Sequence, residues 1–124
     1  SPGARNSPLT YAFIKQKGIK CYSHVDERSS AFFALGLSKS SKTPAVVISP
    51  SGTAAANFFP AVIEASLSHI PLIILSADRP DYLVGTGANQ TIDQQNLYGN
   101  HVRYFKDTGL PTKKIDSSSI SFNL

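Results

Sequence analysis

Two adjacent carboxylates are the sharpest candidates for chemistry in this sequence. Asp26 and Glu27 stand where a strand-like segment gives way to an apolar helical one. A partly buried carboxyl group at such a place has a raised pKa and can share a proton with a ring nitrogen, which makes Glu27 a candidate acid–base residue. The alternative is that both carboxylates only cap the helix and favour its dipole, and the spacing alone favours this alternative.

A turn of small polar residues offers a second kind of chemistry. Ser51, Gly52 and Thr53 precede a predicted helix, where backbone N–H groups can bind an anion. The turn lacks the lysine of a Walker loop and the glycine spacing of a dinucleotide fingerprint, so nucleotide binding has little support. A tight turn with a capping hydroxyl explains the same residues equally well.

Two arginines and two amides complete the set of candidates. Arg5 and Arg79 follow loop signatures, and arginine pairs with carboxylates in a two-pronged geometry, so the pair indicates a substrate that carries carboxylates. Either arginine alone would more often form a surface salt bridge. Asn89 and Gln90 can orient a substrate by hydrogen bonds, although most such pairs form turns.

The elements that must position these residues follow from hydrophobic spacing and from Gly and Pro signals. Helices are predicted over residues 7–16, 27–40, 53–67 (bent or restarted at Pro60) and 93–98, and strands over 19–25, 45–48, 71–76 and 102–105. This alternation predicts an α/β fold, a parallel sheet with helices on both faces. In such sheets ligands bind beyond the carboxyl ends of the strands, where the candidate loops fall.

Composition excludes several classes of protein. The chain has 124 residues, enough for one domain with a core, and its single cysteine cannot form an internal disulfide. The sequence contains no metal-ligand spacing of Cys and His, no apolar run long enough to span a membrane and no signal peptide. The net charge of +4 comes from dispersed lysines, so we expect no nucleic-acid partner. These features predict a cytoplasmic domain.

The ends of the sequence indicate a fragment. The chain has no methionine, opens on Ser1-Pro2-Gly3 and stops within a serine-rich stretch. We therefore expect a domain that is incomplete at both ends, with a strand missing before Ser1.

Taken together, five segments resemble one enzyme family in their order and spacing. They are Ser1-Pro2-Gly3-Ala4-Arg5, His24-Val25-Asp26-Glu27-Arg28-Ser29, Ser51-Gly52-Thr53-Ala54-Ala55-Ala56-Asn57, Ala77-Asp78-Arg79-Pro80 and Gly87-Ala88-Asn89-Gln90. The family is the 2-succinyl-5-enolpyruvyl-6-hydroxy-3-cyclohexene-1-carboxylate (SEPHCHC) synthases, which are thiamine diphosphate enzymes of menaquinone biosynthesis. The resemblance covers the amino-terminal, pyrimidine-binding domain of these enzymes and runs from residue 1 to about residue 102.

The resemblance implies a transferase reaction and a set of site residues. Thiamine diphosphate and Mg²⁺ would serve the decarboxylation of 2-oxoglutarate and the addition of the resulting carbanion to isochorismate. Glu27 matches the glutamate that hydrogen-bonds the aminopyrimidine ring, and Gln90 is the second implied catalytic residue. We assign Ser51 and Gly52 to the cofactor, and Ala4, Arg5, Arg79, Asn89 and Gln90 to the substrate. Ala4 departs from a more frequent serine, which weakens that one contact.

The resemblance also implies an organisation. Residues 1–105 would form the pyrimidine-binding domain and 106–124 the start of a linker. The ligands of the diphosphate and Mg²⁺ would lie in a separate domain, and the active site would form between subunits of a homodimer or tetramer. Two other hypotheses remain, namely another thiamine diphosphate-dependent decarboxylase or acetohydroxyacid synthase, and a non-catalytic anion-binding module.

Overall fold

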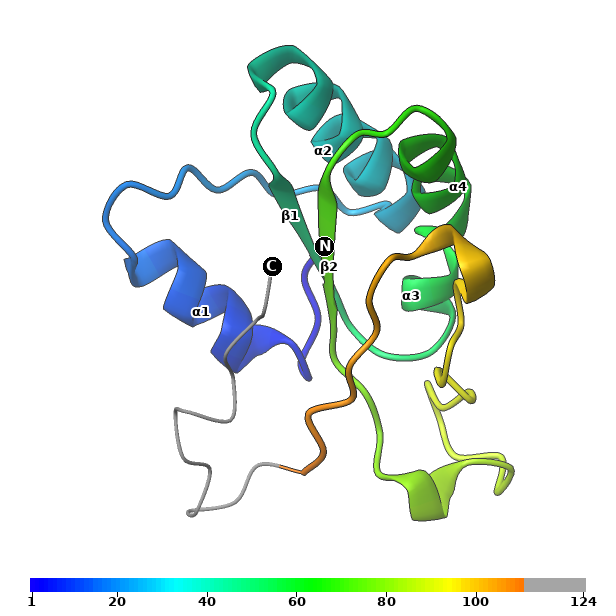
Figure 1. Ribbon diagram of the computed structural model, residues 1–124. Helices are drawn as coiled ribbons and strands as arrows, with labels where there is room; N and C mark the ends of the chain where they lie inside the picture. Colours follow the sequence, from blue (N-terminus) through cyan, green and yellow to red (C-terminus); the bar gives the residue numbers. More distant parts are fainter. Residues whose placement is uncertain (111–124) are drawn as a thin grey trace.

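Two parallel strands form the centre of the protein. The computed structural model describes residues 1–110, so the greater part of the predicted linker lies outside the described residues. Strand β1 (Ala45–Ser49) pairs in parallel with β2 (Leu72–Ser76), and Val47 lies opposite Ile74 (Figure 1). Both strands form where the sequence predicts them, because continuous apolar runs are typical of buried parallel strands.

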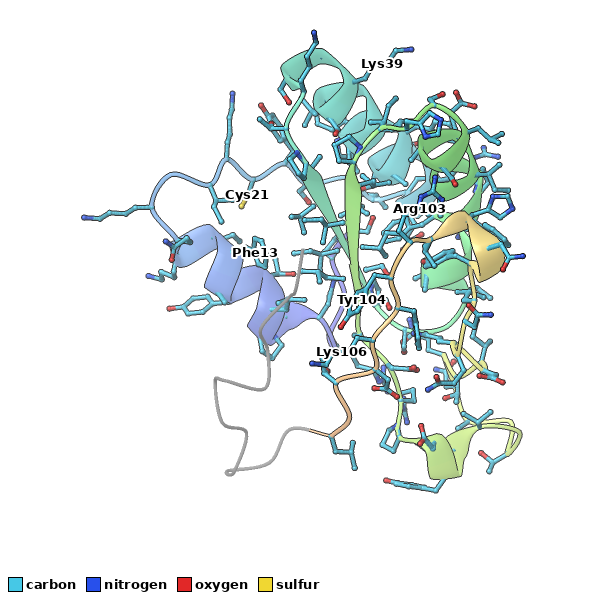
Figure 2. All side chains as sticks on the ribbon, viewed as in Figure 1. Phe13, Cys21, Lys39, Arg103, Tyr104 and Lys106 are labelled. Carbon is cyan, nitrogen blue, oxygen red and sulfur yellow. The ribbon has the colours of Figure 1, made fainter. Side chains whose placement is uncertain are left out.

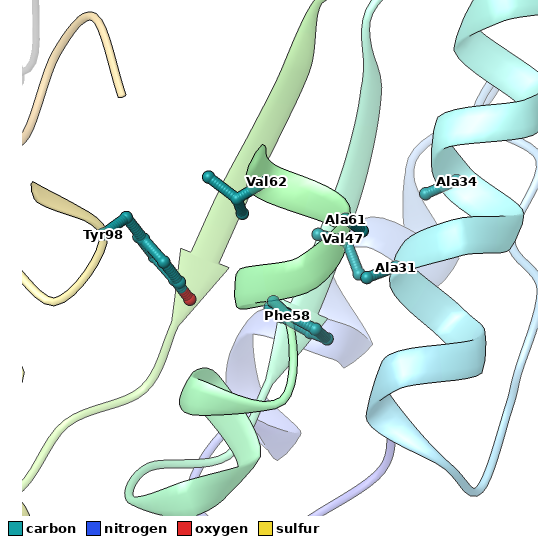
Figure 3. Packing of buried hydrophobic residues seen from close by; sticks show 7 residues of the cluster. All are labelled: Ala31, Ala34, Val47, Phe58, Ala61, Val62 and Tyr98. Atoms are coloured by element: carbon teal, nitrogen blue, oxygen red, sulfur yellow. The ribbon is translucent and has the colours of Figure 1, made fainter. Parts of the chain in front are cut away.

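The core lies between this strand pair and two helices. Helices α2 (Glu27–Ser41) and α4 (Phe59–Leu67) pack against each other, and α2 also packs on both strands. Figure 3 shows the buried cluster at this junction, which consists of Ala31, Ala34, Val47, Phe58, Ala61, Val62 and Tyr98. The alanines let the helices approach closely, and burial of Phe58 contributes about 1.5–3 kcal/mol.

The remaining helices begin and end at proline and at turn residues. Helix α1 (Ser7–Lys15) carries Pro8 in its first turn, as predicted. The helix predicted over 53–67 is divided into α3 (Thr53–Ala56) and α4, and Pro60 lies in the first turn of α4. Proline lacks the N–H that a helix interior needs, so the restart at Pro60 is confirmed.

Three expected elements do not form within residues 1–110. The segments 19–25 and 102–105 are not strands. Residues 93–98 are not a helix, and residues 95–98 form a turn that leads into the 3₁₀ helix η2 (Gly99–His101). A second 3₁₀ helix, η1 (Asp81–Leu83), follows β2. The two wrong strand predictions have one reason: residues 19–25 and 102–105 have suitable side chains, but a strand also needs a partner edge.

The two faces of the strand pair differ in their cover. Val47 and Ile74 face α2 and α4, whereas Val46 and Ile73 on the opposite face remain 38% and 43% exposed. Figure 1 shows α1 on the β1 side of the strand pair, away from α2 and α4. The α/β class with parallel strands is therefore confirmed, and α2 and α4 cover one of its faces. None of the helices within residues 1–110 is long and apolar enough to cross a membrane.

Candidate functional site

Four loops meet at the carboxyl ends of β1 and β2. The amino group of Ser1 donates a hydrogen bond to the carbonyl oxygen of Ile48, 2.7 Å away, and the chain start lies beside the strand ends in Figure 1. Gly3 lies so close to Pro50 that a Cβ atom on it would stand 2.5 Å from the proline Cγ. The opening loop is thus fixed against the end of β1, as the sequence predicts for a parallel sheet.

Gln90 is the point where two of these loops converge. The Nη1 atom of Arg5 donates to the side-chain oxygen of Gln90 at 3.0 Å, across 85 residues of sequence. The hydroxyl of Ser51 donates to the backbone oxygen of Gln90 at 2.8 Å. The backbone of Gln90 itself is left-handed, with φ at 53°, a conformation that is uncommon outside glycine and is often found at functional sites.

Gly52 comes into close contact with the same residue. Its φ is 78°, and a Cβ atom on it would lie 3.0 Å from both the backbone carbon and the backbone oxygen of Gln90. The N–H of Gly52 donates to the side-chain oxygen of Gln94 at 2.7 Å. One of the N–H groups that the sequence offers to an anion is therefore already engaged within the protein.

Arg79 reaches the same segment from the end of β2. Its Nη1 atom donates to the backbone oxygen of Asn89 at 3.3 Å, and its backbone N–H donates to the Asp78 carboxylate at 2.7 Å. Both Arg5 and Arg79 thus contact neutral oxygen atoms of residues 89 and 90. Within residues 1–110 neither guanidinium pairs with a carboxylate, so both keep their charge available to an anionic ligand.

An acidic pocket lies next to Arg79. Its volume is about 340 Å³, and it is lined by Asp78, Asp81, Val84, Asp93, Gln94 and Gln95. Burial raises the pKa of Asp78, the Arg79 N–H works against this shift, and the charges of Asp107, Asp81 and Asp93 raise the pKa further. The site therefore has a cationic part around Arg5 and Arg79 and an acidic part beside it.

Glu27 is the first residue of α2, and its neighbour Asp26 caps that helix. The Asp26 carboxylate accepts the backbone N–H of Ser29 at 2.7 Å. The Ser29 side chain and this backbone N–H together lower the pKa of Asp26, and the side chain has the larger effect. Burial lowers the pKa of the Ser1 amino group, and the charge of the Glu27 carboxylate opposes this shift. The cap is thus made by one of the two carboxylates, and Glu27 is left partly buried without a capping role.

The predicted site residues fall into one connected group and two outliers. Arg5, Ser51, Gly52, Arg79, Asn89 and Gln90 are joined by the contacts above. Ala4 is exposed, and within residues 1–110 Glu27 shares no hydrogen bond with the group. Gln94 is buried and joins two loops but is not among the predicted site residues. Its only signal was its position four residues after Gln90.

Residues outside the site account for much of the positive charge. Figure 2 shows Lys39 on α2, and Arg103 and Lys106 on the segment after η2. The exposed Cys21 lies on the segment between α1 and α2. In the part of the chain that the structure describes, no three His, Cys, Asp or Glu residues are grouped so that they could hold a metal ion.

Comparison with known proteins supports one family. The chain is 54% identical over 110 residues to the 2-succinyl-5-enolpyruvyl-6-hydroxy-3-cyclohexene-1-carboxylate synthase of Myxococcus xanthus, an alignment that covers 89% of the chain. The synthases of Listeria innocua and Haloarcula marismortui are 57% and 53% identical over 111 residues, or 90% of the chain. In each case the matched part is 19% of the relative, so the chain spans about a fifth of the length of these curated proteins.

A family match covers most of the same region. Residues 1–97 match the family described as "Thiamine pyrophosphate enzyme, N-terminal TPP binding domain". These residues include the whole connected group of the candidate site as well as Glu27 and Gln94. With this match over more than half of its length, the chain belongs to the N-terminal TPP-binding domain family of thiamine pyrophosphate enzymes.

Proposed function

We propose that this chain is the pyrimidine-binding part of a SEPHCHC synthase, a transferase of menaquinone biosynthesis. The substrates would be 2-oxoglutarate, which loses CO₂, and isochorismate, which accepts the remaining four-carbon unit. More than 50% identity to synthases from three distant organisms supports this function. The observation that carries the proposal is the convergence of Arg5, Arg79 and Gln90 at the strand ends.

The described residues fit the pyrimidine half of thiamine diphosphate. Glu27 is a partly buried carboxyl group at a helix start where Asp26 already makes the cap. Such a carboxyl group can hold a proton against a nitrogen of an aminopyrimidine ring. When bound, thiamine diphosphate supplies the electron sink that decarboxylation of a 2-oxo acid requires. We assign the ligands of Mg²⁺ and of the diphosphate to the remainder of the protein.

The arginines fit the substrates rather than the cofactor ring. Both 2-oxoglutarate and isochorismate carry carboxylates, and arginine binds a carboxylate through two parallel hydrogen bonds. Within residues 1–110 the hydrogen bonds of the Arg5 and Arg79 guanidinium groups go to neutral oxygen atoms, so a carboxylate can replace these contacts with charge-assisted ones. Gln90 and Asn89 lie between the two arginines and would fix the orientation of the bound substrate.

The complete protein would be a cytoplasmic homodimer or tetramer. We propose that its active site forms where this domain of one subunit meets the diphosphate-binding domain of another. The two other hypotheses have less support. The three relatives named above are synthases of one named reaction. The engagement of Gly52 with Gln94 leaves the 51–53 turn less suited to a simple anion-binding module.

The test is an assay of the full-length protein that carries this segment. CO₂ release from 2-oxoglutarate should depend on thiamine diphosphate and Mg²⁺, and a product should accumulate only when isochorismate is also present. Pyruvate serves as the control substrate, since an acetohydroxyacid synthase would consume it. Turnover of pyruvate without turnover of 2-oxoglutarate would refute the proposed function.

A further inference from the structure

The side chain of Gln94 joins the two loops that leave the strand pair. Gln94 is 7% exposed, and its side-chain oxygen accepts the N–H of Gly52 at 2.7 Å. Its amide nitrogen donates to the backbone oxygen of Ala77 at 3.1 Å and lies 3.5 Å from the hydroxyl of Ser76. Both ends of one buried amide are thus paired with backbone groups of different loops.

This amide lies where the pairing of the two strands ends. The N–H of Ala77 donates to the backbone oxygen of Ser49 at 3.0 Å. Beyond that bond the segment after β1 leads to α3 and the segment after β2 leads to η1. Gln94 bridges them directly after this point. Its side chain therefore fixes the spacing between the two loops, as a further rung of the ladder would.

Both loops contact or carry candidate substrate residues. Gly52 packs against the backbone of Gln90, whose side chain holds the Arg5 guanidinium. Ala77 lies two residues before Arg79, whose guanidinium contacts the backbone of Asn89. A shift of the loops relative to each other would move residues 89 and 90 and, with them, the two guanidinium groups that contact them.

We propose that Gln94 is a positioning residue for the reaction, an inference that rests on the proposed function. Its side-chain hydrogen bonds go to Gly52, Ala77 and Ser76 and not to either arginine, so it acts through the two loops. An apolar side chain of similar size cannot replace it, because the N–H of Gly52 and the carbonyl of Ala77 would then lose their buried partners. Misplacement of reacting groups by about 1 Å costs roughly 100-fold in rate.

The experiment compares two substitutions in the full-length synthase. Gln94→Leu removes both hydrogen bonds, and Gln94→Glu keeps the acceptor for Gly52 but loses the donor to Ala77. We expect kcat per folded enzyme to fall about 10- to 100-fold in both variants, because both lose the hydrogen bond to Ala77 and a displaced site costs rate. The KM for isochorismate is measured separately, and circular dichroism at the assay temperature gives the folded fraction.

Two control variants separate positioning from stability. Gln16→Leu makes the same change at an exposed glutamine that follows α1, outside the candidate site. Tyr98→Phe removes one buried hydrogen bond, from the tyrosine hydroxyl to the backbone oxygen of Ala55, at a place in the core. Both controls should keep the wild-type kcat, and Tyr98→Phe should lower the unfolding temperature.

The outcomes are distinguishable. Wild-type kcat per folded enzyme in Gln94→Leu, or a loss no larger than that in Tyr98→Phe, would overturn the inference while the proposed function stands. If Gln94→Leu does not fold, an unchanged kcat in Gln94→Glu would overturn it in the same way. An inactive wild-type protein would instead refute the proposed function and the inference with it.

Discussion

The adjacent carboxylates Asp26 and Glu27 at the start of α2 differ in their hydrogen bonds. Asp26 accepts a hydrogen bond from Ser29 and is the cap, whereas Glu27 makes no such bond within the helix. The sequence alone favours a capping role for both, because spacing cannot distinguish two neighbouring acids at a helix start. The backbone geometry separates them, and the carboxyl group that is left partly buried is the one that suits the proposed contact with a pyrimidine ring.

Substitution of Glu27 tests whether this residue contacts the pyrimidine ring and does not cap the helix. In the full-length protein, Glu27→Gln should lower the rate of CO₂ release from 2-oxoglutarate by at least about 100-fold, the lower end of general acid–base contributions. The unfolding temperature should change little, since Glu27 does not cap the helix. The measurement is steady-state CO₂ release together with thermal unfolding.

Asp26→Ala is the matched control for Glu27→Gln. It removes the hydrogen bond to Ser29 and should lower the unfolding temperature while activity per folded enzyme is retained. An active Glu27→Gln enzyme with a weakened helix would show that Glu27 is the structural carboxylate after all.

Substitution of Arg79 tests its proposed contact with a carboxylate of the substrate. Arg79→Ala in the full-length protein should impair product formation with isochorismate more than CO₂ release. The lost charge-assisted contact contributes about 1.5–3 kcal/mol, or roughly 10- to 150-fold. Arg79→Lys should recover only part of this loss, because an ammonium group cannot form two parallel hydrogen bonds to a carboxylate. Both reactions are followed in parallel while isochorismate is varied.

Arg103→Ala is the control for Arg79→Ala. Arg103 contacts the hydroxyl of Ser66 on α4, away from the candidate site, so its removal should leave both rates unchanged. Equal losses of CO₂ release and product formation in Arg79→Ala, or full recovery with lysine, would assign Arg79 a general electrostatic role.

Local sequence signals predicted most of the helices and the two paired strands. They did not show that two other strand-like segments would stay unpaired. The segment 45–48 lies between a Thr-Pro stop and a turn, and 71–76 is a continuous apolar run, so both were predictable. Residues 19–25 have comparable side chains and form no strand. Strand formation there depends on a neighbouring edge, which no window of the sequence contains.

The candidate site was likewise only partly predictable from the sequence. Parallel topology brings the loops after β1 and β2 to one edge, and the connected group from Arg5 to Gln90 follows from that rule. Gln94 does not follow from it. A buried amide that joins two loops is defined by its partners, which lie 42 and 17 residues away in the sequence. No periodicity marks such a residue.

Gly52→Ala tests the close packing of the loop after β1. A side chain at φ 78° is strained by about 1–3 kcal/mol, and its Cβ would also meet the backbone of Gln90 at 3.0 Å. We expect a lower unfolding temperature and a loss of activity, because Gln90 must move. Gly85→Ala is the control: Gly85 has φ at 77° but open space around it. Equal effects of the two substitutions would show that strain alone, and not the contact with Gln90, matters.

Charge is distributed unevenly around the strand ends. The chain carries a net charge of +4, yet four aspartates from three distant segments lie near one another beside Arg79. They are Asp78, Asp81, Asp93 and Asp107. Folding brings these like charges together, so their mutual repulsion opposes the fold whenever all of them are ionised.

Asp78→Asn tests this repulsion through the dependence of stability on pH. The pKa of Asp78 is raised in the folded protein, so the folded state holds the proton more tightly than the unfolded state. The stability that protonated Asp78 contributes is present below the unfolded pKa of about 3.9 and is lost as pH rises through the folded value. Asparagine is neutral throughout, so at pH 7 Asp78→Asn should be more stable by about 0.5 kcal/mol at most, because Asp78 is largely exposed.

Asp26→Asn makes the same chemical change, but it should change the stability of the fold in the opposite direction. The hydrogen bond from Ser29 lowers the pKa of Asp26, so its ionised form stabilises the fold above the unfolded pKa, and that contribution is lost as pH falls through the folded value. Thermal unfolding of the full-length variants at pH 7 and pH 3 measures both effects. At pH 7 Asp78→Asn should unfold above the wild-type temperature and Asp26→Asn below it, and both differences should shrink at pH 3. A less stable Asp78→Asn at pH 7 would show that the hydrogen bond from the Arg79 N–H to the charged carboxylate outweighs the repulsion among the four aspartates.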